Sequence, residues 1–130
     1  MYSAWGNGQS FLNGEQIKVN QDTLENNGIV LVSDGTSDKT SGAKLIFNVI
    51  SKGWQCRIHG SAQLDLCAVA TGKAVGYVKT KAPDWDVIAG MFIVKNAGGK
   101  ADFLDKKSVV ASNAIEDNHV ALTSILPCGL

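Results

Sequence analysis

The distribution of apolar and polar residues along the chain predicts short strands alternating with helices. Residues 4–19 are expected to form a β-hairpin, because Phe11-Leu12 and Ile17-Lys18-Val19 flank Asn13-Gly14, a dipeptide that readily takes positive φ in tight turns. The polar residues 20–27 predict a loop. Residues 28–32 form a continuous apolar run of strand length, which indicates a buried strand.

Two longer segments show the spacing of apolar residues that is typical of helices. A helix over 40–52 would place Leu45, Ile46, Val49 and Ile50 on one face and end at Gly53. A second helix over 84–97 would have one face formed by Trp85, Ile88, Ala89, Phe92 and Ile93, with Val87, Met91 and Val94 extending the apolar surface. The second helix is therefore expected to be buried on more than one side.

The remaining segments complete an alternating order. We predict strands over 54–58, 74–78, 100–104 and 107–111, a helix capped by Ser61 that runs to Ala70, and a last helix over 115–125. Alternation of strands and helices predicts an α/β layered fold, and the hairpin adds antiparallel pairing. We expect one domain over residues 1–130, with a mixed β-sheet flanked by helices.

Charge and hydropathy exclude two classes of partner. The 12 basic residues balance the 12 acidic residues, so the chain lacks the basic excess of a nucleic-acid-binding surface. No apolar run approaches the ~18 to 20 residues of a membrane span. Residues 1–6 lack the charged and apolar regions of a signal peptide, and we expect a cytoplasmic protein.

The cysteines predict neither a disulfide framework nor a zinc site. Cys56, Cys67 and Cys128 are odd in number and contain no Cys-x-x-Cys pair. Cys67 falls inside an apolar helix, where a buried free thiol is expected. Cys128 is close to the end of the sequence, where we expect it to be exposed.

The N-termini of two predicted helices contain residues of the types that bind a metal ion or an anion. Asp86 would occupy the first turn of the helix over 84–97, where a carboxylate suits the positive end of the helix dipole and is also a hard oxygen ligand for Mg²⁺. Gly60, Ser61 and Ala62 precede another helix, where free backbone N–H groups favour anions. Asp65, one turn further on, is expected to support that site or to be a capping or solvent-facing acid.

Four segments, in this order, resemble the second half of the inositol monophosphatase family of Mg²⁺-dependent phosphatases. They are residues 8–14 (GQSFLNG), 60–72 (GSAQLDLCAVATG), 85–99 with Trp85-Asp86 and Gly98-Gly99, and 110–113 (VASN) followed by His119. The resemblance implies that Asp86 is a ligand of Mg²⁺. It also implies that Gly60, Ser61 and Ala62 contact the polyol part of a sugar or inositol phosphate.

The resemblance does not extend to the family's first half. That half contributes a Glu-Glu pair and an Asp-Pro-Ile-Asp-Gly-Thr segment, which supply most metal ligands and the attacking water. Asp34-Gly35-Thr36 is similar to the end of the second motif, but Leu31 stands where it has its first Asp, and Asp-Gly is ordinary turn chemistry. We therefore expect a half-domain that is catalytically incomplete alone, with no complete catalytic set in this chain.

Lys79 departs from the family pattern. It lies seven residues before Asp86, where many inositol phosphatases of the family have an acid that holds substrate hydroxyls. Lysine cannot accept hydrogen bonds. Lys79 is therefore expected to favour a more anionic substrate than inositol monophosphate, or else to be an exposed lysine.

Two other arrangements are weaker hypotheses. His59, Ser61 and Asp65 could form a hydrolytic triad, but residues 59–63 lack the Gly-x-Ser-x-Gly elbow. A metal site formed by His59 and His119 has no support from their spacing.

Three functions follow from these patterns. The first is a Mg²⁺-dependent sugar or inositol phosphate phosphatase. The second is a non-catalytic domain that binds a small anion or a separately encoded first half. The third is an interaction protein, because loss of the first half would expose apolar surface, and this predicts a homo-oligomer, most simply a two-fold dimer.

Overall fold

A computed structural model describes residues 2–5, 9–25, 28–33, 39–80, 84–104 and 108–126 of the chain. The elements, in chain order, are β1 (Tyr2–Trp5), β2 (Gln9–Leu12), β3 (Glu15–Ile17), β4 (Ile29–Val32), α1 (Lys39–Ser51), β5 (Gln55–Arg57), α2 (Ala62–Ala70), β6 (Gly76–Lys79), α3 (Asp84–Asn96), β7 (Lys100–Leu104), β8 (Ser108–Ser112) and α4 (Glu116–Ser124). The predicted strands and helices are all present, with boundaries shifted by a few residues.

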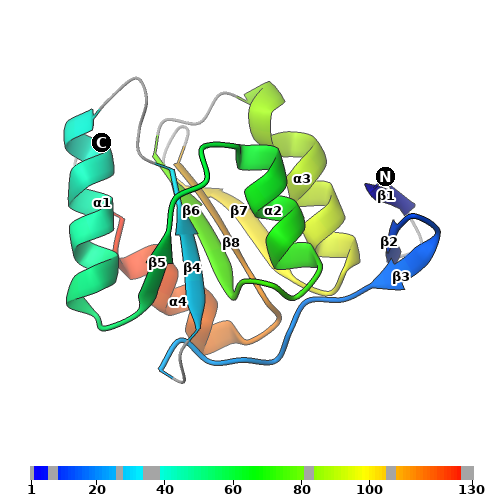
Figure 1. The fold of residues 1–130 in the computed structure, drawn as a ribbon, viewed down its shortest axis with the longest axis horizontal. Helices are drawn as coiled ribbons and strands as arrows, with labels where there is room; N and C mark the ends of the chain where they lie inside the picture. The colour runs from blue at the N-terminus through cyan, green and yellow to red at the C-terminus, as the bar shows by residue number, and fades with distance from the viewer. Residues whose placement is uncertain are drawn as a thin grey trace.

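A mixed five-stranded sheet lies at the centre of the fold, in the order β5-β4-β6-β8-β7. Strand β4 pairs in parallel with β5 and with β6, whereas β8 is antiparallel to both β6 and β7. Figure 1 shows α1 and α4 on one side of this sheet and α2 and α3 on the other. The predicted α/β layered fold with a mixed sheet is confirmed.

Each face of the sheet has its own apolar core because successive side chains of a strand point to opposite faces. In β4, Leu31 packs toward α2 and α3, and Val30 and Val32 pack toward α1 and α4. These three side chains are almost fully buried, as expected for a continuous apolar run in a central parallel strand.

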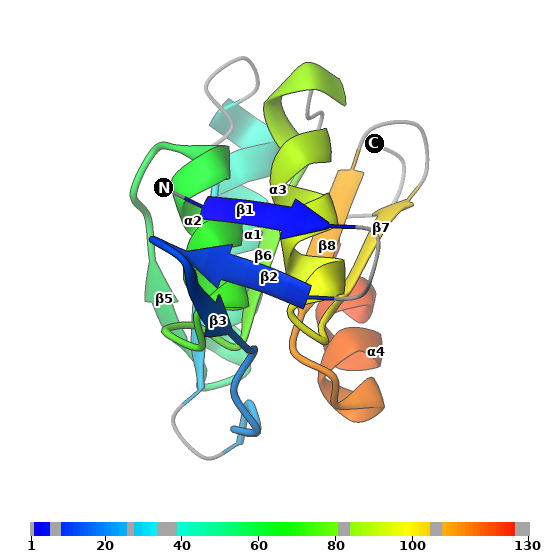
Figure 2. The ribbon, with the colours of Figure 1, turned by 90° about the vertical axis from the view of Figure 1, so that its right-hand side faces the viewer.

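The amino-terminal strands form a separate antiparallel sheet, β1-β2-β3, that lies against the outer side of α3 (Figure 2). The predicted hairpin corresponds to β2 and β3, and its turn has positive φ at Asn13 (52°) and Gly14 (84°). The Ser10 hydroxyl donates a hydrogen bond of 2.6 Å to the Ile93 carbonyl of α3. This sheet and α2 cover different sides of α3, so the prediction that this helix is buried on more than one side is confirmed.

The predicted apolar faces of the two longer helices need correction. In α1, Leu45 and Val49 are fully buried, but Ile50 is 60% exposed. In α3, the side chains that extend the apolar surface form the buried face: Val87, Met91 and Val94. The stripe predicted as the main face is partly open, with Ile88 55% and Phe92 45% exposed. The helical period alone cannot decide which of two apolar stripes faces the sheet.

Close packing of α2 against α3 depends on Gly90. A Cβ atom at this position would lie 2.6 Å from Leu66 Cδ1 and 2.7 Å from Leu66 Cβ. It would also lie 3.0 Å from Gln63 Oε1, so the contact reaches the first turn of α2. The absence of a side chain at Gly90 therefore sets the spacing between the two helices.

The helices in the described part of the chain are short. None of its helices combines the length and the apolar composition needed to cross a bilayer. The two longest, α1 and α3, have 13 residues each.

Candidate functional site

The connections of the parallel strands create a crevice at one edge of the sheet. Strand β4 is followed by α1 on one face, whereas its neighbours β5 and β6 are followed by α2 and α3 on the other face. The helices that follow adjacent strands therefore lie on opposite faces of the sheet. Crevices of this type are the usual ligand sites of open α/β sheets.

A small pocket occupies this position. Its lining residues come from the ends of β4, β5 and β6 and from the start of α2: Ser33, Gly60, Ser61, Ala62, Asp65, Tyr77 and Lys79. The four residues predicted to bind substrate, Gly60, Ser61, Ala62 and Lys79, thus lie around one pocket. Strand β6 ends at Lys79, one residue later than the sequence predicts. This lysine therefore lies at the carboxyl end of the strand.

The start of α2 provides backbone donors to the pocket. Gly60 has a φ of +84°, which lets the chain turn sharply into the helix. Ser61 is the N-cap, in extended conformation, and its hydroxyl accepts a hydrogen bond of 3.3 Å from Leu64 N–H. The first N–H groups of a helix have no carbonyl partner within it, and together with the dipole they favour an anion.

A buried carboxylate lies beside these donors. The Asp65 side chain is 1% exposed, and its Oδ1 lies 3.0 Å from Nδ1 of His59, a side chain that is 51% exposed. Burial raises the pKa of the Asp65 carboxyl above its usual range, although the hydrogen bond and charge of His59 and the charge of Lys79 oppose this effect. Asp65 is therefore a pocket acid rather than a solvent-facing one, and it can accept or donate a hydrogen bond there.

The predicted metal ligand, Asp86, is in the first turn of α3. Its side chain lies outside the part of the chain that the structure describes, as do Asp34-Gly35-Thr36 and Cys128. Among the described residues, no group of three or more His, Cys, Asp and Glu side chains could hold a metal ion. Of the described residues that line the pocket, Asp65 alone is a carboxylate and Lys79 stands near it, a set that fits an anion better than Mg²⁺.

The structure does not form the other predicted constellations. The Ser61 hydroxyl caps α2, and no hydrogen bond links it to His59 in the described part of the chain, so the three residues are not a hydrolytic triad. His59 contacts Asp65 beside α2, whereas His119 of α4 lies on the opposite face, with Nε2 2.9 Å from Asp102 Oδ2. The two histidines therefore form separate contacts and no shared metal site.

A Ser112-His119-Asp102 chain, in which Ser112 and His119 are buried and Asp102 is exposed, was not predicted from the sequence. Ser112 Oγ lies 2.6 Å from His119 Nδ1, and Ser112 is fully buried at the end of β8. A serine without access to solvent cannot attack a substrate, so we interpret this chain as a link between β7, β8 and α4. Ser33 and Tyr77 of the pocket were also missed, although the rule that ligands bind at the carboxyl ends of parallel strands could have found them.

Comparison with known proteins gives the same fold and several relatives. A fructose-1,6-bisphosphatase/inositol-1-monophosphatase of Thermotoga maritima is 34% identical over 122 residues, which cover 92% of this chain and 44% of the relative. A putative Nus factor SuhB of Neisseria meningitidis is 31% identical over 116 residues, covering 80% of this chain and 44% of the relative. The crystal structure of the extragenic suppressor protein suhB of Bartonella henselae has a TM-score of 0.84 at 23% identity, covering 99% of this chain and 52% of that one.

Each of these matches covers most of this chain but only part of the relative. The chain spans about half the length of the curated relatives it matches. The sequence model of the inositol monophosphatase family matches residues 1–125, which is nearly the whole chain. With this match and the shared α/β fold, the chain belongs to the inositol monophosphatase family.

Proposed function

We propose that this chain binds the phosphate ester of a sugar or inositol in the pocket at the carboxyl ends of β4, β5 and β6. In this proposal it is the substrate-binding half of a Mg²⁺-dependent phosphoric monoester hydrolase. The observation that supports it most strongly is the convergence of Gly60, Ser61, Ala62 and Lys79 on one pocket. The helix start and the lysine supply donors for phosphate oxygens, and the buried Asp65 supplies an acceptor for a hydroxyl.

We further propose that the chain alone does not turn over substrate. Asp86 is four residues before Gly90, so the helical repeat puts position 86 on the face of α3 that packs against the first turn of α2. There Asp86 would contribute one ligand to Mg²⁺, which polarises a phosphoryl group and activates water when bound. One carboxylate with waters holds Mg²⁺ weakly, and the remaining ligands would come from a first half of the family type.

Lys79 supports a more anionic substrate than an inositol monophosphate. Its ammonium group provides three donors and no acceptor at the pocket edge. A second phosphate or a carboxylate on the substrate would pair with it, whereas a neutral polyol hydroxyl would gain less. We therefore expect sugar bisphosphates to bind more tightly than monophosphates of the same sugar.

Titration calorimetry with inorganic phosphate, fructose 1,6-bisphosphate and inositol 1-phosphate, with and without Mg²⁺, tests these proposals. We expect binding without hydrolysis, and a loss of roughly tenfold in bisphosphate affinity in Lys79→Glu, the size of a lost charge-assisted hydrogen bond. Lys73→Glu, with the same charge change at the far end of α2, is the matched control. Hydrolysis by the chain alone would contradict its incompleteness, and absence of binding by every anion would contradict the site.

A second candidate function is protein association, which an apolar surface favours. Ile88, Met91, Phe92, Lys95 and Phe103 line a shallow pocket between α3 and β7, and Ile88, Phe92 and Phe103 are each more than a third exposed. Exposed apolar patches of this kind mark interfaces. We propose that a second copy of the chain or a family-type first half covers it.

Light scattering at micromolar concentration tests this association. We expect a dimeric mass that falls to the monomer in Phe92→Lys. Val120→Lys, at a 57% exposed position of α4, is the control and should leave the mass unchanged. A monomeric mass for the unmodified chain would refute self-association, and failure to bind a family-type first half would remove the second partner.

The cytoplasm is the compartment in which we propose that the protein acts. Cys56 and Cys67 are both free thiols. Free thiols are the usual state of cysteine in a reducing compartment.

A further inference from the structure

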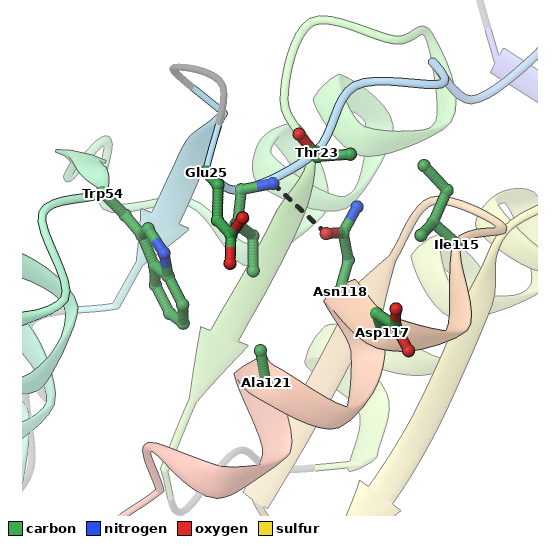
Figure 3. A pocket seen from close by; sticks show the side chains of 8 residues that line it. Thr23, Glu25, Trp54, Ile115, Asp117, Asn118 and Ala121 are labelled. Carbon is green, nitrogen blue, oxygen red and sulfur yellow. Dashed lines mark hydrogen bonds between the residues drawn. The ribbon is translucent and has the colours of Figure 1, made fainter.

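A third pocket lies at the amino ends of the parallel strands, at the opposite end of the sheet from the proposed phosphate site. Three segments that are distant in sequence line it: Thr23, Leu24 and Glu25 before β4, Trp54 before β5, and Ile115, Asp117, Asn118 and Ala121 at the start of α4 (Figure 3). Its volume is about 180 Å³. A pocket of this size suits a small ligand or a single side chain.

The walls of this pocket are held in place by buried and partly buried hydrogen bonds. Asn118 Oδ1 accepts from Leu24 N–H at 3.2 Å, and Asn118 Nδ2 donates to the Asp22 carbonyl at 2.9 Å. Asn113 Nδ2 donates to the same carbonyl at 2.9 Å. The segment 22–24 is thereby fixed to Asn113 and α4, so a ligand does not have to order this segment on binding.

The interior of the pocket is largely apolar. Leu24 is buried, Ala121 and Trp54 are half-buried, and the amide of Asn118 is already used by the hydrogen bonds that fix the loop. Figure 3 shows the indole ring of Trp54 on one side and α4 on the other. An aromatic face next to an apolar floor attracts an organic cation with an apolar stem.

The charged residues that the structure describes at the rim are both acidic. Glu25 and Asp117 line the pocket, and no Lys, Arg or His is among the described residues that do so. Neither carboxylate has a hydrogen bond or ion pair with another described residue, whereas the neighbouring Glu116 pairs with Lys100 Nζ at 2.9 Å. The dipole of α4 is sufficient to explain Asp117. Glu25 is not in a helix, and in Figure 3 it lies between Trp54 and α4.

We propose that this pocket binds a small organic cation, namely a guanidinium or alkylammonium group on an apolar stem. The cation would stack on Trp54 and pair with Glu25, while the carboxylate of Asp117 offsets the positive end of the α4 dipole at this pocket. A free amine and the side chain of an arginine or lysine from a partner share this chemistry. The proposal concerns a different end of the sheet and does not depend on the phosphate site.

Titration with n-butylguanidinium, followed by ¹H–¹⁵N NMR, tests the proposal on the full chain. We expect shifts of the Trp54 indole N–H and of the Leu24 and Asn118 amides, with a dissociation constant on the order of millimolar. The neutral isostere n-butylurea is the ligand control and should bind at least about fivefold more weakly, since it lacks the cation–π and ion-pair terms. Binding of n-butylguanidinium should weaken as salt is raised.

Substitutions separate the contributing groups. We expect Trp54→Leu to weaken n-butylguanidinium binding about fivefold and Glu25→Gln about threefold. Glu116→Gln is the matched control, because it removes an acid from the same turn of α4 as Asp117 without changing the pocket lining. Retained amide shifts elsewhere in the spectrum show that each variant is folded.

Each result decides the proposal or the source of the cation. A peptide with one arginine that binds more tightly than n-butylguanidinium, and loses binding when citrulline replaces the arginine, supports the site and assigns a protein side chain. Tighter binding of n-butylguanidinium than of the peptide supports the site and assigns a free cation. Equal shifts with n-butylurea, or no shift of Trp54, Leu24 and Asn118 at 50 mM n-butylguanidinium, would overturn the proposal.

Discussion

At the carboxyl ends of the parallel strands the pocket contains Asp65, a carboxylate that is almost fully buried, whereas at their amino ends the buried polar side chains include the uncharged Asn113 and Asn118. The carboxylate is held next to His59 and Lys79 even though burial disfavours its charge. The asparagines instead satisfy the backbone of the loop before β4. The buried carboxylate suits ligand binding but lowers the stability of the fold. The hydrogen bonds of the asparagines stabilise the fold and leave an apolar pocket beside them.

The largest effect on the free energy of unfolding is expected at the amino ends of the parallel strands. Asn118→Ala removes three hydrogen bonds and leaves the buried Leu24 N–H without its acceptor, while the Asp22 carbonyl keeps its bond from Asn113. We expect a loss of about 2 to 3 kcal/mol in the free energy of unfolding, measured by urea denaturation. Asn96→Ala, which removes one exposed hydrogen bond to the Phe92 carbonyl, should cost far less. Equal losses would show that the asparagine network does not stabilise this end.

The next largest effect concerns the helix pair beside the carboxyl-end pocket. Gly90→Ala should destabilise the protein by about 1 to 2 kcal/mol, because the clash with Leu66 outweighs the higher helix propensity of alanine. Ala89→Gly, at the exposed neighbouring position, measures the propensity difference alone. A Gly90→Ala variant that is more stable than the parent would mean that α2 and α3 can separate without cost. The measurement is again urea denaturation.

A substitution at Asp65 should show the stability cost of the carboxyl-end pocket. Because the pKa is raised in the folded state, folding favours the protonated carboxyl, and the cost of the buried charge is present above this raised pKa. We expect Asp65→Asn to stabilise the protein at pH 7 by on the order of 1 kcal/mol, a typical single-substitution effect. The gain should shrink as the pH falls through the raised pKa. Urea denaturation at pH 7 and pH 4 checks this, and a gain that grows toward acid would contradict it.

The smallest effect on stability is expected at Ser61, where two substitutions distinguish helix capping from anion binding. Ser61→Ala removes the bond to Leu64 N–H and should cost about 0.5 to 1 kcal/mol. Ser61→Asp keeps a capping oxygen and should restore the stability, but its charge should abolish phosphate binding in calorimetry. Phosphate binding that survives in Ser61→Asp would mean that the anion does not approach the start of α2.

Much of the lining of the candidate pocket could be predicted from the sequence because its parts are local. Gly60, Ser61 and Ala62 are adjacent, Ser61 caps the helix that it precedes, and Asp65 contacts His59 only six residues away. Lys79 joins them because β6 is parallel to β4 and ends at the same edge of the sheet. That proximity depends on strand order, which a single sequence does not specify. The role of Asp86 as a metal ligand stays a prediction.

The pattern of apolar residues determined the order of strands and helices, the buried central strand β4 and the layered α/β class, because each depends on periodicity within one segment. The tertiary structure decided which apolar stripe of α3 is buried, since Gly90 brings α2 against one side and β1-β2-β3 covers another. It also decided that Trp54, Glu25 and Asn118 surround one pocket. These contacts join residues far apart in the chain, and only the pairing of the strands and the packing of the helices on the sheet bring them together.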